Sequence, residues 1–240
     1  MRAVFLDRDG VINRLPENRY VTSPAEFDLL PGVPEAVRDL NVAGLQVVVV
    51  SNQSACSRGL LTKDTLKTLT QLMVEGIEKG GGRITAIYYC PHHPDEGCLC
   101  RKPKPGLLLR ARKELGIDLE SSYLVGDSLS DVEAGRRVGC QTVLIQGPAE
   151  RSGETAPVWV SYVTRDLKGA VRWIVRREKT GSRKQKVRAD TQRSISNSID
   201  WIQDVREQLE ASASVKSKLA SFQAQALVDI ALVMMEALAT

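Results

Sequence analysis

Short apolar runs alternate with amphipathic segments along the first 177 residues. Runs rich in β-branched residues predict buried strands, and we expect them at 2–6, 46–50, 84–89, 123–125, 142–145 and 158–163. In the intervening segments apolar residues recur at helical spacing, which predicts helices over 34–43, 62–79, 105–115, 129–138 and 167–177. Strands that alternate with helices predict an α/β fold with a doubly wound parallel sheet of Rossmann type.

The pattern changes after residue 177. Residues 178–190 lose apolar periodicity, and we predict a basic linker over 178–194. Two further helices are expected over 195–209 and 215–238, and the apolar residues of the second recur at mostly three- to five-residue steps. One face of that helix must be buried against a partner helix or another chain. The predicted organisation is therefore a domain at 1–177, a linker, and a helical extension at 195–240 that offers a surface for self-association.

Composition and charge limit the classes of protein. The chain is 42% hydrophobic and 26% charged, as expected of a globular protein, and carries a net charge of +4. Residues 176–193 hold 8 basic and 2 acidic residues, but no aromatic residue, which favours a linker over a nucleic-acid contact. No apolar run approaches the roughly 20 residues of a membrane span, and the N-terminus lacks the pattern of a signal peptide. We therefore expect a cytoplasmic protein without a membrane partner.

Two aspartates follow the first predicted strand. Asp7 and Asp9 are separated by one residue, so they lie on one side of an extended chain. Such a pair can supply a nucleophile and a general acid when their environments separate their pKa values. Asp127 ends another strand and would meet the pair at the carboxyl edge of a parallel sheet. These acids predict a Mg²⁺ site beside an anionic substrate, with Asp131 in a supporting position.

A cluster of cysteine and histidine predicts a second metal site. Cys90, Cys98 and Cys100 surround the only two histidines of the chain, His92 and His93, in the spacing C-x-H-x5-C-x-C. Three thiolates and one imidazole are a ligand set typical of structural Zn²⁺. We predict Cys90, His92, Cys98 and Cys100 as the ligands, with His93 as the alternative to His92.

Two cations follow this cluster directly. A metal-bound loop that presents Arg101 and Lys102 would offer fixed positive charges to phosphate oxygens, with little loss of conformational freedom on binding. We therefore expect both side chains to bind a phosphate group of the substrate.

Three segments resemble motifs of the haloacid dehalogenase-like phosphatases, namely FLDRDGVI at 5–12, VVSNQ at 49–53, and VGD at 125–127 with Asp131. The resemblance implies that Asp7 attacks phosphorus to form an aspartyl-phosphate. It implies that Asp9 protonates the leaving oxygen and later activates water, and that Ser51 binds the transferring phosphoryl group. Mg²⁺ would then lie between Asp7, the backbone carbonyl of Asp9 and Asp127.

The loop at 90–106 (CPHHPDEGCLCRKPKPG) resembles two branches of that family, the D-glycero-D-manno-heptose 1,7-bisphosphate 7-phosphatases and the histidinol-phosphatases. The loop SNQS at 51–54, followed by Arg58 and Gly59, resembles the heptose branch, although Ala55 and Cys56 replace its usual Gly-Ile, and Ser128 stands where that branch has lysine. The resemblance implies a small phosphorylated sugar as substrate and no large cap domain. It also implies that Arg101 contacts substrate phosphate, that Lys102 does so as a catalytic residue, and that the pocket is lined by Asn52, Gln53 and Ser54.

The sequence leaves three functions open. The first is removal of the 7-phosphate from heptose bisphosphate, and the second is the same chemistry on histidinol phosphate. The third is an inactive phosphatase fold that acts as a scaffold through its helical tail. Residues from about 195 resemble the N-terminal helices of phosphoheptose isomerases, so the tail is either part of such a domain or an oligomerisation element.

Overall fold

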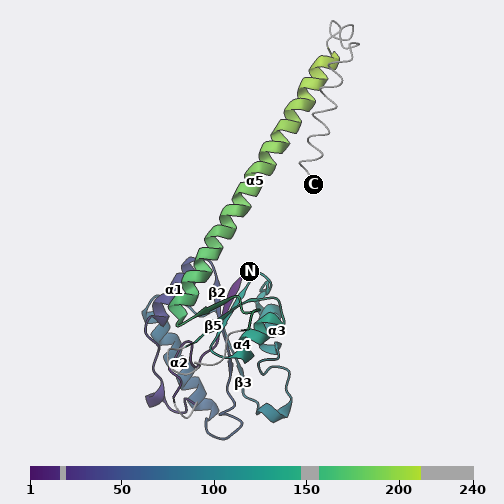
Figure 1. Cartoon of the computed structure of the whole chain (residues 1–240). Helices are drawn as coiled ribbons and strands as arrows, with labels where there is room; N and C mark the ends of the chain where they lie inside the picture. Colours follow the sequence, from purple (N-terminus) through teal and green to yellow (C-terminus); the bar gives the residue numbers. More distant parts are fainter. Residues whose placement is uncertain (17–19, 147–156, 212–240) are drawn as a thin grey trace. The chain divides into compact units, whose positions relative to one another are not determined.

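The computed structural model describes residues 1–16, 20–146 and 157–211 (Figure 1). The chain divides after Glu178 into two compact units, and the first contains the sheet. None of the described helices combines the length and the apolar character that a membrane-spanning segment needs.

Six parallel strands form one sheet in the order β3-β2-β1-β4-β5-β6. Their bounds are β1 Ala3–Leu6, β2 Gln46–Asn52, β3 Ala86–Cys90, β4 Tyr123–Gly126, β5 Gln141–Ile145 and β6 Tyr162–Thr164. The predicted doubly wound α/β fold is confirmed. The last strand was predicted over 158–163 but begins only at Tyr162 and ends at Thr164. Because β1 is central and the chain order reverses beside it, the carboxyl ends of β1, β2 and β4 meet at a topological switch point, where such sheets bind ligands.

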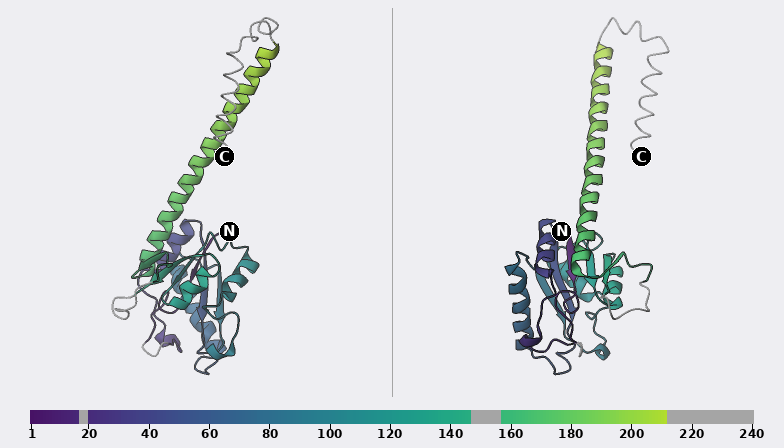
Figure 2. Two further views of the ribbon diagram at one scale, coloured as in Figure 1. Left: turned by 45° about the vertical axis from the view of Figure 1, so that its right-hand side comes forward. Right: turned by 60° about the vertical axis from the view of Figure 1, so that its left-hand side comes forward.

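Helices cover both faces of the sheet (Figure 2). Successive side chains of β1 point to opposite faces, so Val4 and Leu6 join one apolar core and Ala3 and Phe5 the other. The first core takes in α1, α2 and the start of α5, and the second takes in α3 and α4. The bounds are α1 Val33–Val42, α2 Lys63–Lys79, α3 Gly106–Leu115, α4 Leu129–Arg136 and α5 Leu167–Ala211, with single 3-10 turns at Pro24–Glu26 (η1) and Pro94–Glu96 (η2). In the described part of this unit no further domain covers the sheet edge.

Local sequence signals set the ends of two helices. The Thr62 hydroxyl accepts a hydrogen bond from the Thr65 N–H at 3.1 Å and so caps α2. Gly44 follows α1 with φ of +77°, a left-handed conformation that glycine adopts without steric cost, and it turns the chain into β2.

The predicted linker is helical. Residues 178–194 belong to α5, which continues without interruption to Ala211. The loss of apolar periodicity does not exclude a helix, because the segment holds six Lys and Arg residues, which favour helices, and no proline, so it can be helical without an apolar face. The predicted helix over 195–209 lies within α5, and the one over 215–238 lies outside the described residues.

Packing of α1 on the sheet is expected to supply a large share of the stability of the first unit. Leu40 is fully buried in the first core, so its replacement by alanine leaves a cavity. We expect Leu40→Ala to lower the free energy of unfolding by about 2–5 kcal/mol in urea denaturation. Val42 on the same helix is 82% exposed, and Val42→Ala should leave it within about 0.5 kcal/mol. Equal effects of the two substitutions would contradict this packing.

Candidate active site

Asp7 lies at the carboxyl end of β1 and is nearly buried. Its backbone N–H donates to the carbonyl of Val125 at 3.0 Å, so the ladder between β1 and β4 extends into the site. Its carboxylate Oδ1 accepts a hydrogen bond of 2.7 Å from the Lys102 ammonium. A residue 95 positions later in the chain is thereby brought against the predicted nucleophile.

Lys102 joins three elements at one buried ammonium. Besides Asp7, its Nζ lies 2.6 Å from Oδ1 of Asp131 and donates to the Val50 carbonyl at 2.8 Å. The loop that carries Lys102 is itself held by Asn52, whose side-chain amide exchanges two hydrogen bonds, of 3.1 and 3.2 Å, with the Lys102 backbone. The predicted pocket residue Asn52 therefore fixes the place of the lysine.

Burial and charge change the pKa values of this group. Burial raises the pKa of Asp7 to about 7, the Lys102 ammonium opposes this rise, and the carboxylates of Asp131, Asp127 and Asp9 add to it. Burial alone would lower the pKa of Lys102, but Asp131 and Asp7 raise it above its ordinary value, so the ammonium stays charged. A further cation near Asp7 would relieve the repulsion among these acids.

Carboxylates of Asp7, Asp127 and Asp131 form a group in which one oxygen from each lies within 4.8 Å of the others. Oxygen donors of this kind suit Mg²⁺. Two glycines allow the close approach. A Cβ on Gly10, whose φ is +82°, would lie 2.3 Å from Oδ2 of Asp127, and a Cβ on Gly126 would lie 2.1 Å from Cβ of Asp131. The donor set thus fits the predicted metal.

Asp131 is fixed as part of the cap of α4. Its Oδ2 accepts hydrogen bonds from the Ser128 N–H at 3.1 Å and from the Ser128 hydroxyl at 2.6 Å, while its Oδ1 faces Lys102. The serine that stands in place of the branch's lysine therefore orients the supporting acid. The contact between Asp131 and Lys102 was not evident from the sequence, because the two residues lie too far apart in the chain to produce a local pattern.

Asp9 is held apart from this acidic group by a separate set of donors. Its carboxylate accepts hydrogen bonds from the guanidinium of Arg8, from the Asn13 amide at 2.9 Å and from the Gln53 amide at 2.8 Å. The Gln53 amide nitrogen also donates to the buried Ser51 hydroxyl at 3.1 Å. One hydrogen-bond network around Asp9 thus contains Arg8, Asn13, Ser51 and Gln53. The sequence contained no signal for the part that Arg8 plays in it.

The two remaining predicted phosphate-binding residues lie in the loops around this edge. Nη1 of Arg101 is buried and has no hydrogen-bond partner among the described residues, so it can donate to an anion. Ser54 is buried, and its carbonyl accepts from the Arg58 N–H at 3.1 Å, which closes the turn after β2.

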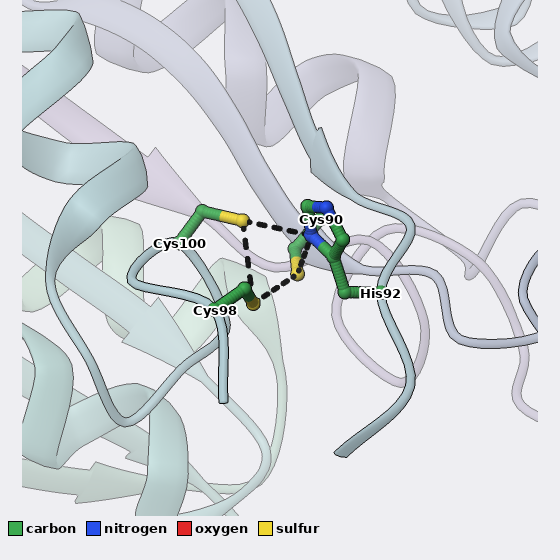
Figure 3. A group of neighbouring side chains, drawn as sticks. All are labelled: Cys90, His92, Cys98 and Cys100. Carbon is green, nitrogen blue, oxygen red and sulfur yellow. Dashed lines mark hydrogen bonds between the residues drawn. The ribbon is translucent and has the colours of Figure 1, made fainter. Parts of the chain in front are cut away.

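The predicted zinc ligands converge at the end of β3 (Figure 3). Sγ of Cys98 lies 3.6 Å from Sγ of both Cys90 and Cys100, and Nδ1 of His92 lies 3.5 and 3.2 Å from the same two sulfurs. Four ligands at about 2.0–2.3 Å from a common centre would be separated by roughly 3.3–3.8 Å. The chemistry and the spacing of the donors therefore fit a tetrahedral Zn²⁺ ion.

The structure distinguishes the two histidines. His93 caps the short helix η2, because its Nδ1 accepts from the Asp95 N–H at 3.4 Å, and it does not belong to the thiol cluster. Lys104 closes the loop from the other side, because its ammonium donates to the carbonyls of Gly97 and Cys98 at 2.7 and 3.0 Å. The loop that carries Arg101 and Lys102 therefore has the Cys/His cluster before these two residues and the hydrogen bonds of Lys104 after them.

Several proteins that this chain resembles over most of their own length are named phosphatases. The family model described as HAD-hydrolase-like matches residues 99–170. The chain is 39% identical over 180 residues to the D-glycero-beta-D-manno-heptose-1,7-bisphosphate 7-phosphatase of Yersinia pestis, covering 71% of this chain and 95% of that protein. The enzyme of the same name from Escherichia coli K12 is 40% identical over 180 residues, with 71% and 93% covered.

A solved structure agrees with these sequence matches. The D,D-heptose 1,7-bisphosphate phosphatase from B. bronchiseptica, complexed with magnesium and phosphate, is 36% identical and matches with a TM-score of 0.68. The match covers 74% of this chain and 99% of that one. The chain therefore belongs to the haloacid dehalogenase-like hydrolases, in their branch of D-glycero-D-manno-heptose-1,7-bisphosphate 7-phosphatases, which are phosphoric monoester hydrolases.

Proposed function

We propose that this protein removes the 7-phosphate of D-glycero-D-manno-heptose 1,7-bisphosphate to give the heptose 1-phosphate. The observation that carries the proposal is the buried contact of Asp7 with Lys102 beside the carboxylates of Asp127 and Asp131. Phosphoryl transfer requires a positioned nucleophile and cations that neutralise the negative charge of the phosphate oxygens. A carboxylate next to a buried ammonium meets this requirement. The proposal is further supported by the two relatives named for this reaction, which align with this chain over 95% and 93% of their own length.

In the proposed reaction, a carboxylate oxygen of Asp7 attacks the phosphorus of the 7-phosphate and the bond from phosphorus to the sugar oxygen breaks. Asp9 gives the leaving oxygen its proton. Water then attacks the aspartyl-phosphate, Asp9 takes a proton from that water, and inorganic phosphate leaves as the Asp7 carboxylate is restored. Ser51 and Lys102 hold the oxygens of the transferring group.

Two metal ions have different parts in the proposal. Asp7, Asp127 and the backbone carbonyl of Asp9 would hold Mg²⁺, which supplies positive charge for the phosphate oxygens when bound. Cys90, His92 and the two cysteines of the CLC sequence at 98–100 would hold Zn²⁺ as a structural ion. Soft sulfur ligands and hard oxygen ligands separate the two ions chemically.

The zinc loop also bears on the substrate. Arg101 follows the last zinc ligand directly, and its buried Nη1 has no partner among the described residues. We propose that it binds a phosphate oxygen of the sugar. A small phosphorylated sugar is the partner that such a site would take. The role of residues 178–240, including self-association through their helices, stays a prediction beside the proposed phosphatase domain at 1–177.

Replacement of the nucleophile tests the covalent mechanism. Asp7→Asn keeps the shape of the side chain but removes the attacking oxygen anion, and we expect phosphate release with Mg²⁺ to fall by about 10³-fold or more. Asp39→Asn, at an exposed ion pair with Arg38 on α1, should leave the rate unchanged. An Asp7→Asn variant that keeps its full rate would overturn the mechanism.

A comparison of substrates tests the proposed specificity. We expect the β anomer of D-glycero-D-manno-heptose 1,7-bisphosphate to give the highest kcat/KM, because the relatives at 39–40% identity are named for that anomer. Phosphate release is measured for this compound, its α anomer and histidinol phosphate at equal concentrations. Preference for histidinol phosphate would refute the proposed substrate and leave the chemistry in place.

Removal of zinc tests the structural site. Metal analysis should find one zinc ion per chain, and a chelator that binds Zn²⁺ in preference to Mg²⁺ should lower both the melting temperature and, by roughly 10-fold, phosphate release, because the loop that holds Arg101 and Lys102 loosens. Cys98→Ser should have the same effect, while Cys56→Ser, outside the cluster, should keep its zinc. A zinc-free chain with full activity and stability would falsify the proposal for this site.

A further inference from the structure

Arg8, between the two motif aspartates, has a fully buried side chain. A guanidinium carries five N–H donors and a permanent charge, so its burial is costly unless it is paired. Nε and Nη2 donate to Oδ1 of Asp9 at 3.2 and 3.1 Å, and Nη2 lies 3.1 Å from Oδ2 as well. The buried guanidinium therefore forms a hydrogen-bonded ion pair with the next residue in the chain, Asp9.

Gln53 ties this pair to the second strand. Its amide oxygen accepts from Nη2 of Arg8 at 3.0 Å, and its amide nitrogen donates to Oδ2 of Asp9 at 2.8 Å. Arg8, Asp9 and Gln53 thus close a ring of hydrogen bonds in which each residue contacts the other two. On the other side, Tyr89 lies beside the guanidinium, with its ring centroid 5.7 Å from Cζ. The guanidinium is confined by both neighbours.

Both oxygens of Asp9 are held by donors, while 17% of its side-chain surface remains exposed. A general acid and base must keep its carboxylate at hydrogen-bond distance from the reacting oxygen and must be reachable by substrate and water. A side chain at the start of a loop has no such fixed direction by itself. The ring of Arg8 and Gln53 supplies that direction and leaves one side of the carboxylate accessible.

We propose that Arg8 is a positioning residue, whose buried guanidinium, braced by Gln53, holds the Asp9 carboxylate in the direction needed for proton transfer. The inference rests on the proposed function, because it takes Asp9 as the general acid and base. It goes beyond that function in giving the residue between the two motif aspartates a part in the reaction. Arg8 acts through Asp9 and needs no contact with the substrate.

Stability alone is a weak explanation for this arrangement. Replacing both partners of a buried ion pair by apolar side chains is often neutral or stabilising, and removing one partner is strongly destabilising where the other charge is left buried and uncompensated. Here Asp9 would keep Asn13, Gln53 and its access to water. We therefore expect Arg8→Met to fold with a melting temperature close to that of the unmodified chain.

A double-mutant cycle tests the inference. The kcat and KM for heptose bisphosphate with Mg²⁺ are measured for the unmodified chain, Arg8→Met, Asp9→Asn and the double variant. We expect Arg8→Met to lower kcat by about 10- to 100-fold with KM within about threefold, and Asp9→Asn to lower it by about 10³-fold. The double variant should match Asp9→Asn within about threefold, because Arg8 has no part once its partner is gone.

Two further variants serve as controls. Arg110 on α3 also pairs with a carboxylate, at 2.8 Å from Glu114, and its Cζ lies 5.2 Å from the Tyr88 ring centroid, but it is exposed. Arg110→Met should leave kcat unchanged. Arg8→Lys keeps the buried charge but lacks the planar guanidinium with its fixed N–H donors. If Arg8→Met fails to fold, this variant tests whether Arg8 positions Asp9. It should lower kcat only when Asp9 is present.

The outcomes separate the two proposals. An unchanged kcat in Arg8→Met, or a further loss of the full Arg8→Met factor in the Asp9→Asn background, shows that Arg8 does not act through Asp9 and overturns the inference, while the phosphatase function stands. An unmodified chain that releases no phosphate from either anomer, from histidinol phosphate or from 4-nitrophenyl phosphate overturns the proposed function and the inference with it.

Discussion

The buried ammonium of Lys102 is the interaction on which the rest of the site depends. It contacts the carboxylates of Asp7 and Asp131 at 2.7 and 2.6 Å in a region almost closed to solvent. Buried carboxylates that lie close together would repel one another without such a cation. One side chain therefore allows the ends of β1, β2 and β4 to bring their polar residues into a single cluster.

The position of Lys102 is itself the result of several local arrangements. The Asn52 amide binds its backbone on one side, and the loop of Cys90, His92, Cys98 and Cys100 precedes it on the other. A single residue separates Cys100 from Lys102, so any change in the cluster is transmitted through a very short backbone connection. This gives a physical reason for the proposed zinc site to lie so close to the proposed phosphate site, since a fixed loop loses little freedom when it meets a charged ligand.

The two aspartates of the first motif lie two residues apart and have different surroundings. Asp7 faces Lys102 and the other acids, whereas Asp9 is held by Arg8, Asn13 and Gln53. Burial and neighbouring acids raise the pKa of Asp7, and the Lys102 ammonium limits that rise. The chain turns at Gly10, whose φ is +82°, and this turn brings Asn13 back to Asp9. Such different environments suit the separate roles proposed for the two aspartates.

Local sequence patterns determined the strands, most helices and the residue types of both proposed metal sites. Apolar runs and caps act over a few neighbouring residues, so β1, β2 and the bounds of α2 could be predicted. The same reasoning failed for residues 178–194, because helix propensity without an apolar face leaves no periodic signal. The sequence favoured His92 over His93, and the structure places His92 with the three cysteines. Only the tertiary structure brought Lys102 to Asp7, and Gln53 to Arg8 and Asp9. Apart from the direct neighbours Arg8 and Asp9, these contacts are decided by the packing of separate strands and loops, which no local pattern encodes.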